Sequence, residues 1–472
     1  MDQSRKGKRG KDGPGRAGPE GPREVAWRVL MRVEEGAFSG LELGHALERA
    51  GLSREDAALA TEIVYGTIQR LNTIDWVLAG RVRGWPDRIE PGVRALLRLS
   101  YYQLRWLNRV PPYAAVNEAV RLARKHGHPG VAGLVNAVLR GLLRDGVAPP
   151  LPEGLSDAER IALEHSHPLW LVERWIAAYG ADTAEAVCRA NNEPPRQSAR
   201  VNPLRATRDR LLEDMREAGL DARPSLLSEA GVTAARGGNL AATPWFSAGL
   251  ITVQDESSML VAAVADPRPG SVAVDCCAAP GGKATHLAEL MEDCGHVIAN
   301  DAHPRKAELI RRHAERLGLS CIRVMTGDAA DLPERLGAET ADAVLLDAPC
   351  SGLGVIRRKP EIKWNKSERD IAALAELQAS LLDRVQALVK PGGVLVYSTC
   401  TIAREENEDN VRRFLNRHPA FSLDPAWPES VLGPLRKAGL AADPFPGMVQ
   451  LLPHHFGSDG FFIARFRREG RL

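Results

Sequence analysis

The sequence lacks any apolar run of the roughly 20 residues that a membrane-spanning helix requires, and its first residues contain no apolar signal core. We therefore expect a soluble chain, cytoplasmic by default and without a membrane partner. Its 472 residues exceed what one ordinary hydrophobic core holds, so two or three folded units are expected.

Cysteine spacing of the kind that marks disulfide scaffolds or zinc sites is also missing. The count of seven is odd, and six of the cysteines lie in the second half of the chain, namely Cys276, Cys277, Cys294, Cys321, Cys350 and Cys400. No CxxC or CxxH pair occurs among them, so we expect neither a disulfide framework nor a metal site. Reduced thiols in a reducing compartment fit this pattern best.

Net charge is small, yet the charges are unevenly distributed. Residues 1–150 contain 24 Lys and Arg against 16 Asp and Glu, out of totals of 62 and 60, which leaves 38 against 44 in the remainder. A basic module joined to a near-neutral one favours docking on a polyanion, although a solvated helical surface explains the same charges equally well. Residues 1–22 combine Lys, Arg, Gly and Pro with almost no apolar residue, which predicts a disordered basic tail.

Apolar periodicity divides the rest of the chain into three parts. Residues 23–148 have apolar residues at helical spacing, which predicts an all-α bundle. A proline cluster follows, and residues 156–265 are mixed, which predicts a small α+β connector. In residues 266–470 short β-rich runs alternate with helical segments, a pattern typical of a parallel sheet with helices on both faces.

Unusual residues follow five successive strands of this predicted sheet, at the point where each strand ends. They are Asp275 to Lys283, Asp301, Asp328, Asp347 to Cys350, and Ser398 to Cys400. Because open α/β sheets bind ligands at the carboxyl ends of their strands, we expect these residues to line one site.

The first of these turns, DCCAAPGGK, predicts a cofactor turn. Gly281 and Gly282 allow a ligand to approach the backbone closely, although an ordinary turn also uses Gly-Gly. The dinucleotide fingerprint and the Walker A ending are both absent, and Pro280 removes an amide that a pyrophosphate would use. A nucleoside cofactor without a phosphate remains, and S-adenosylmethionine is the obvious one.

Two aspartates at the next strand ends fit a nucleoside. Asp301 follows the glycines by about 20 residues, where a carboxylate accepts hydrogen bonds from ribose hydroxyls, and Asp328 is placed to accept one from an adenine amino group. For either aspartate alone a helix N-cap explains the residue as well.

Cys350 and Cys400 bring two thiols to the same predicted edge, and a basic segment from Arg357 to Lys363 follows the first of them. A single buried cysteine is more often an inert core residue. A pair beside a cofactor turn instead favours covalent chemistry. Addition of a thiolate to C6 of cytosine makes C5 nucleophilic toward a methyl group, and a second thiol can serve as, or position, the base that completes the reaction. The residues alone do not distinguish the two roles.

The motifs CAAPGGK, DAPCSG and YSTC resemble those of the NOL1/NOP2/Sun family of RNA cytosine-C5 methyltransferases. The segments ATEIVYGTIQR, AAVNEAVRLAR and GLVNAVLRGL are similar to the NusB-like RNA-binding domain of the bacterial ribosomal-RNA members. The resemblance implies an α/β fold: a Rossmann-like S-adenosylmethionine-dependent methyltransferase domain, preceded by an all-α NusB-like domain and the small connector, which would also contact RNA.

The resemblance also implies roles for residues. Cys400 would be the nucleophile and Cys350 would assist product release. The cofactor contacts would be Cys277, Ala278, Ala279, Pro280, Gly281, Gly282, Lys283, Asp301, Asp328 and Asp347. The partner would be 16S rRNA, naked or early in assembly, methylated at cytosine 967, with no obligate protein partner. A sister activity on another RNA stays open. A non-catalytic RNA-binding factor is disfavoured because both thiols and the Gly-Gly turn are present.

Overall fold

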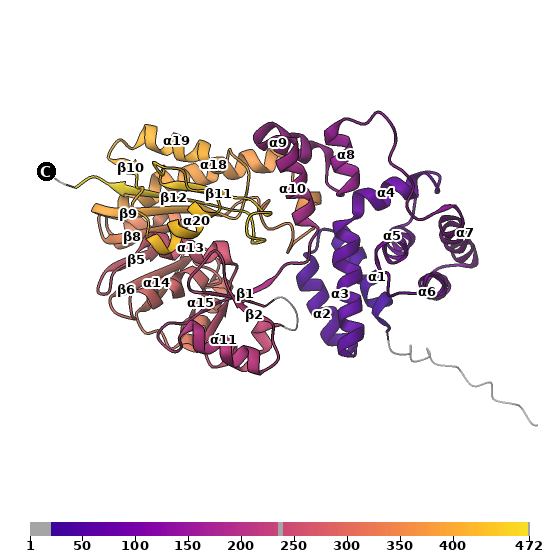
Figure 1. Cartoon of the computed structure of the whole chain (residues 1–472), viewed down its shortest axis with the longest axis horizontal. Helices are drawn as coiled ribbons and strands as arrows, with labels where there is room; N and C mark the ends of the chain where they lie inside the picture. The colour runs from indigo at the N-terminus through magenta and orange to yellow at the C-terminus, as the bar shows by residue number, and fades with distance from the viewer. Residues whose placement is uncertain (1–19, 235–238, 471–472) are drawn as a thin grey trace, which may run out of the picture. The chain divides into compact units, whose positions relative to one another are not determined.

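A computed structural model describes residues 20–234 and 239–470 and divides them into two compact units (Figure 1). The first unit comprises the chain up to Leu155 together with Ala162–Ser166. The second comprises Ser156–Ile161 and the chain from His167 onward. Of the predicted basic tail, residues 1–22, positions 1–19 lie outside the described residues.

The first unit is a helical bundle, which confirms the predicted all-α fold. Its helices are α1 (Pro22–Glu34), α2 (Ser39–Ala50), α3 (Arg54–Gln69), α4 (Leu71–Ala79), α5 (Pro91–Trp106), α6 (Pro112–His126) and α7 (Pro129–Asp145). Helix α5 is buried at nearly every position from Val93 to Gln103 and packs against α1, α3, α6 and α7. A Cβ at Gly66 of α3 would lie 1.9 Å from the Tyr102 ring, so glycine lets these two helices pack closely. The bundle therefore has its core around α5.

The second unit begins with helices and a small antiparallel sheet. After α8 (Asp157–Glu164), which spans the boundary between the units, come α9 (Leu169–Tyr179), α10 (Ala181–Asn191), α11 (Arg208–Glu217) and α12 (Pro244–Ser247). The strands β1 (Gln197–Val201), β2 (Ala222–Pro224), β3 (Gly231–Ala234) and β4 (Ile251–Val253) form a sheet in the order β2-β3-β1-β4. This mixed region is the predicted α+β connector.

The largest part of the second unit is an eight-stranded sheet. Its strands are β5 (Val272–Asp275), β6 (His296–Asp301), β7 (Ile322–Thr326), β8 (Ala341–Asp347), β9 (Val389–Thr399), β10 (Phe421–Leu423), β11 (Met448–Leu451) and β12 (Phe461–Arg468). The order is β10-β12-β9-β8-β5-β6-β7, with β11 also paired to β12. Strands β5 to β9 are parallel, as predicted, whereas β12 runs antiparallel to β9.

Helices cover both faces of this sheet (Figure 1). They are α13 (Glu256–Ala265), α14 (Gly282–Leu290), α15 (Pro304–Leu317), α16 (Leu332–Leu336), α17 (Ile362–Asn365), α18 (Glu368–Val385), α19 (Glu408–Arg417) and α20 (Glu429–Lys437). Along β8, Leu345 faces the core formed with α13, α14 and α15, and Leu346 faces the core formed with α18 and α19. Alternation with a period of two therefore builds two cores from one strand, as a sheet buried on both faces requires.

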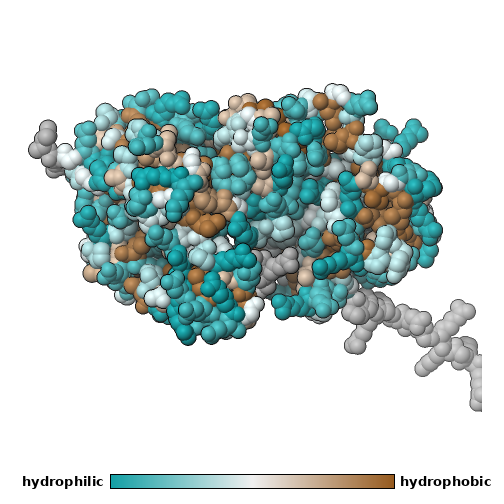
Figure 2. Space-filling view, viewed as in Figure 1, coloured by the Kyte–Doolittle hydropathy of each residue, from teal (hydrophilic) through white to brown (hydrophobic). Residues whose placement is uncertain are grey.

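The surface is mostly hydrophilic, with hydrophobic side chains in separate patches on the face seen in Figure 2. Within residues 20–234 and 239–470, no helix combines the length and the apolar character needed to cross a membrane.

Candidate active site

The carboxyl ends of the parallel strands bring the predicted site residues to one edge of the sheet. Strand β5 ends at Asp275, β6 at Asp301 and β8 at Asp347. Strand β9 ends at Thr399, directly before Cys400. Because β8 lies between β5 and β9, the cofactor turn and both thiol-bearing turns start from three neighbouring strands.

The predicted cofactor turn, Cys277–Lys283, leads from β5 into the first residues of α14. Gly281 has a φ of +110°, a backbone conformation that disfavours other residues, and a Cβ there would lie 3.2 Å from the Ile310 Cα. The Ala278 N–H donates to the Asn300 carbonyl at 2.7 Å, and the Gly281 N–H donates to the Ala278 carbonyl at 2.7 Å. The turn is therefore tight and fixed to β6.

A buried arginine of the small antiparallel sheet also holds this turn. Arg200, on β1, is fully buried and donates to both carboxylate oxygens of Glu289 on α14, at 2.8 and 3.0 Å. The same guanidinium donates to the Gly282 carbonyl at 2.7 Å and to Thr285 Oγ1 at 3.1 Å, and also to Gln254. Bidentate pairs of this kind fix geometry strongly, so β1 positions the start of α14. We name these contacts the Arg200 clamp.

Asp275 is buried at the base of the turn. By hydrogen-bond geometry neither of its carboxylate oxygens has a partner among the described residues. Burial and the nearby Asp347 carboxylate raise the pKa of Asp275 to about 7, although the Cys277 backbone N–H is close enough to lower it somewhat. A buried carboxyl without a partner is available for a positively charged or hydrogen-bond-donating group of a ligand.

Asp328 is the N-cap of the short 3-10 helix Ala329–Asp331, as the alternative interpretation of this residue allowed, whereas the N-cap of α15 is His303 and not Asp301. Asp301 Oδ1 accepts from the His303 N–H at 2.9 Å, and Asp328 Oδ1 accepts from the Ala330 N–H at 2.9 Å. Asp301 is buried, whereas Asp328 is exposed. Neither Oδ2 makes a hydrogen bond within the described part of the chain, so one oxygen of each carboxylate is left for a ligand.

Lys283 and Asp347 form an ion pair between the turn and β8. Lys283 Nζ donates to Asp347 Oδ2 at 2.8 Å, and Ser398 Oγ donates to Asp347 Oδ1 at 2.8 Å. Burial alone would lower the pKa of Lys283, but Asp347, Asp275 and Cys400 raise it on balance. Lys283 therefore keeps its positive charge close to Cys400.

The two predicted catalytic thiols are in contact. Cys350 Sγ and Cys400 Sγ lie 3.3 Å apart, and both residues are half-buried. The hydrogen bond to Cys400, together with burial, raises the pKa of Cys350 well above its ordinary value. Either sulfur can be the donor in the hydrogen bond between them.

A buried carboxylate that the sequence analysis did not single out fixes the Cys350 turn. Glu406 is fully buried and accepts from the Ser351 N–H at 2.9 Å, from the Ser351 hydroxyl, and from Gln378 Nε2 at 2.8 Å. Gln378 Nε2 also donates to the Pro349 carbonyl at 2.9 Å. Ser351 Oγ is 2.7 Å from Thr401 Oγ1, so this network joins the residues beside both thiols.

In the basic segment after Cys350, Arg357 and Lys363 are buried, Arg358 is partly buried and Lys359 is exposed. Arg357 is 4% exposed and donates to the carbonyls of Ala190, Pro453 and Gly457. Arg358 pairs with Asp255 and Asp459, both at 2.8 Å. These charges serve packing around the thiol-bearing turn.

Sequence reasoning missed Arg200, Glu406 and Gln378 because no motif marks them. Glu406 stands in the acidic run REENED, where spacing alone does not tell which carboxylate is buried. Arg200 is one of many arginines in the connector, and its partner Glu289 is 89 residues away.

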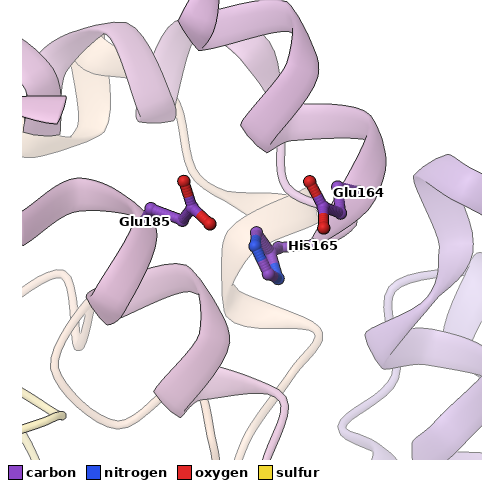
Figure 3. Close-up of side chains that lie close together, drawn as sticks. All are labelled: Glu164, His165 and Glu185. Atoms are coloured by element: carbon purple, nitrogen blue, oxygen red, sulfur yellow. The ribbon is translucent and has the colours of Figure 1, made fainter. Parts of the chain in front are cut away.

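Figure 3 draws three further side chains of types that bind metal ions, Glu164, His165 and Glu185. Glu164 and His165 belong to the first unit and Glu185, on α10, to the second. They make up no site within either unit.

Three families of known proteins match successive parts of the chain. Residues 20–144 match the NusB family, residues 167–241 match a ferredoxin-like domain described as "Methyltr_RsmF/B-like", and residues 262–467 match "16S rRNA methyltransferase RsmB/F".

Individual relatives match over nearly the whole length. The chain is 43% identical to "Probable ribosomal RNA small subunit methyltransferase B" of Bacillus subtilis (strain 168), covering 95% of this chain and 99% of that protein. It is 35% identical to the protein of the same name from Synechocystis sp., covering 94% and 99%. A solved structure titled "Crystal Structure of PH0851" has a TM-score of 0.79 and 30% identity, covering 95% of this chain and 99% of that one.

The fold, and the residues at the carboxyl ends of the parallel strands, define a Rossmann-like RNA methyltransferase. Two further domains, a helical bundle and a small α+β connector, precede its catalytic domain, as expected. The NusB-like identity of the helical bundle is confirmed, and the connector is ferredoxin-like. The chain belongs to the RsmB/F family of 16S rRNA methyltransferases.

Proposed function

We propose that the chain transfers a methyl group from S-adenosylmethionine to C5 of a cytosine in 16S rRNA, at cytosine 967, through a covalent bond between Cys400 Sγ and C6 of the base. The observation that carries this proposal is the contact of the two thiols, 3.3 Å apart beside the Lys283–Asp347 pair. An inert core cysteine would need neither a second thiol in contact with it nor a charged pair beside it.

The surroundings of the thiols suit a thiolate nucleophile. The attacking group must be a thiolate, and the charge of Lys283 lies close enough to Cys400 to stabilise one there. The two sulfur atoms share a hydrogen bond in which either can be the donor. The roles of Cys400 as nucleophile and of Cys350 in product release are taken from the resemblance to cytosine-C5 methyltransferases.

The reaction then follows ordinary covalent catalysis. The Cys400 thiolate adds to C6, which makes C5 nucleophilic, and C5 takes the methyl group. The proton on C5 must leave before the C6–S bond breaks and restores the thiolate. Cys350, held by the Glu406 network beside Cys400, would serve as or position the base for this elimination.

The residues at the turn fit S-adenosylmethionine, which supplies an electrophilic methyl group when bound. The buried carboxyl of Asp275 suits the ammonium group at the amino-acid end of that cofactor. The free oxygens of Asp301 and Asp328 suit ribose hydroxyls and an adenine amino group, respectively. The backbone of Ala278 to Gly281 offers close approach. Contacts from Lys283 and Asp347 would be indirect, since these two side chains pair with each other.

The substrate must present an exposed base. A stacked cytosine in a helix does not reach the edge of the sheet, so we propose a loop cytosine in naked or early-assembly rRNA, with no obligate protein partner. All seven cysteines are free thiols, in keeping with the reducing cytoplasm.

Trapping the covalent intermediate tests the cysteine roles. We expect Cys400→Ala to abolish methylation while cofactor binding stays intact, and Cys350→Ala to accumulate a protein–RNA adduct that survives a denaturing gel. Cys294→Ala, at an exposed cysteine away from the strand ends, is the matched control and should behave as wild type. An adduct with Cys400→Ala in place of Cys350→Ala would overturn the assignment.

Bisulfite mapping tests the target. Ribosomal RNA treated with the enzyme and S-adenosylmethionine should gain one protected cytosine, at position 967. Protection at another position, or in transfer RNA only, would refute the substrate assignment but not the proposed methylation of cytosine C5.

A further inference from the structure

The helical bundle carries a groove that the catalytic chemistry does not use. Helices α6 and α7 pack side by side (Figure 1). The groove between them has a volume of about 820 Å³. We name it the α6–α7 groove. Its lining residues are Asn117, Val120, Arg121, Arg124, Pro129, Ala132, Gly133, Asn136 and Arg140.

The lining of the groove is basic and contains no carboxylate. The charge of Arg121 is compensated by an ion pair with Glu118, 2.9 Å away, a residue that does not line the groove. Within the described part of the chain, Arg124 makes no ion pair, and Arg140 donates only to Asn136, at 2.9 Å. Two exposed guanidinium groups therefore keep an uncompensated charge on opposite walls of the groove.

An exposed aromatic residue extends the same helix face. Tyr113 lies four residues before Asn117 on α6, so the two side chains are neighbours along the helix. Tyr113 is 70% exposed, which is unusual for an aromatic side chain in a folded domain. A flat ring at the end of a basic groove is the combination that binds single-stranded nucleic acid, because bases stack on the ring while arginines contact phosphates.

We propose that the α6–α7 groove binds a single-stranded segment of the substrate RNA, with phosphates on Arg124 and Arg140 and a base stacked on Tyr113. The proposal rests on the proposed function, since it takes RNA as the substrate. The groove has apolar residues as well as its arginines and asparagines, namely Val120, Pro129 and Ala132. The uncompensated charges of Arg124 and Arg140 nevertheless favour a polyanion over a protein partner. Duplex RNA would not present the unstacked base that Tyr113 receives.

Gly133 allows the groove to be blocked without harm to the helix. A Cβ at this position meets nothing within 4 Å, and glutamate is a better helix former than glycine. Gly133→Glu would place a negative charge where we expect phosphates. Gly141→Glu makes the same change on the same helix, outside the lining, where the nearest atom to a Cβ is 3.9 Å away.

The experiment measures binding of single-stranded and duplex RNA to the full chain by fluorescence anisotropy over a range of salt concentrations. We expect Gly133→Glu to weaken single-stranded RNA binding about tenfold or more and to reduce the salt dependence, while Gly141→Glu stays near wild type. Tyr113→Ala should weaken binding, and Tyr113→Phe should restore it, because stacking needs the ring and not the hydroxyl. Thermal unfolding of each variant checks the fold.

Three results would overturn the proposal. One is wild-type affinity for single-stranded RNA in both Gly133→Glu and Tyr113→Ala. Another is equal loss of affinity in Gly133→Glu and Gly141→Glu, which would point to nonspecific charge. If Gly133→Glu binds RNA normally but loses a protein partner, the groove is a protein-binding site and the proposal fails. Failure of the proposed function is distinct, since it would appear as a wild-type enzyme that methylates no RNA.

Discussion

Aspartates of the same chemistry have different environments at the edge of the sheet. Asp347 is neutralised by Lys283, Asp328 is exposed and caps a turn, and Asp275 is buried without a partner. The differences arise from the residues that surround each strand end rather than from the strand itself. Burial and the nearby Asp347 carboxylate raise the pKa of Asp275 to about 7.

The raised pKa of Asp275 predicts a pH dependence of stability. Between its ordinary value of 3.8 and about 7 the folded protein binds a proton that the unfolded chain has released, so stability falls as the pH rises through this window. The whole shift corresponds to at most about 4 kcal/mol. We expect Asp275→Asn to remove this dependence, so the wild type should lose stability relative to the variant between pH 4 and 7. Denaturant unfolding of the cofactor-free proteins measures it, and parallel pH curves would contradict the prediction.

We predict that a substitution at Glu406 lowers kcat without weakening cofactor binding. Glu406→Gln keeps the shape but replaces an acceptor oxygen with a donor facing Ser351 or Gln378, so the Cys350 turn loses its fixed position. We expect kcat to fall roughly 10- to 100-fold, the size of a small misplacement of reacting groups. The KM for S-adenosylmethionine should stay near wild type.

The neighbouring residue provides the control. Glu405→Gln removes only a half-exposed ion pair with Arg174, so its kcat should change little. A similar loss of activity in both variants would show that the buried network has no special role.

The motif residues could be predicted from sequence because their spacing after strands is local information. Residues that act across the sheet could not. Glu406 and Ser351 are 55 positions apart, and only the pairing of β8 with β9 brings their turns together. The sequence alone likewise left the roles of the two thiols open, and their assignment stays a proposal.

At the scale of elements, the Arg200 clamp is the contact most open to test. Removing one partner of a buried ion pair leaves an uncompensated charge, which costs about 3–5 kcal/mol. We expect Arg200→Met to destabilise the protein by that amount and to weaken cofactor binding, because Gly282 loses its contact. The double variant Arg200→Met with Glu289→Met should recover much of the loss, since no charge stays buried.

Denaturant unfolding of the two single variants and the double variant gives the coupling energy. Additive effects would show that the ion pair contributes nothing beyond its separate side chains. Arg216→Met, on α11 of the same connector, is a suitable control because its contact to the Ala222 carbonyl is local.

Most elements could be predicted because their patterns are strong. The runs before Asp275, Asp301 and Asp347 are continuous and apolar, as strands buried on both faces require. Strand β10, with three residues, and β11, with four, were not predicted because so short a run has no clear period. The need for glycine at position 354 could not be predicted either. A Cβ there would lie 2.0 Å from the Gly460 carbonyl oxygen, and Gly460 is over 100 positions away in the sequence.

At the scale of the whole molecule, the predicted domain boundaries stay a proposal, while the division into a basic helical part and a catalytic part has a measurable consequence. We expect deletion of residues 1–145 to weaken RNA binding about tenfold or more, because the positive excess of the front part is lost. Cofactor affinity should change little, since every cofactor contact proposed above lies in the second unit. Calorimetry for the cofactor and a salt titration for RNA measure the two effects. Equal RNA affinity in both forms would contradict the prediction.

The Arg200 clamp predicts a coupling between RNA binding and cofactor binding. Arg200 lies on a strand of the ferredoxin-like sheet and ends on the backbone of the cofactor turn. An RNA that displaces β1 on docking must therefore alter the affinity for S-adenosylmethionine, and the cofactor must alter the affinity for RNA by the same factor. The order in which RNA and cofactor bind then changes no equilibrium. It decides only whether the complex with RNA alone or the complex with cofactor alone accumulates before methyl transfer.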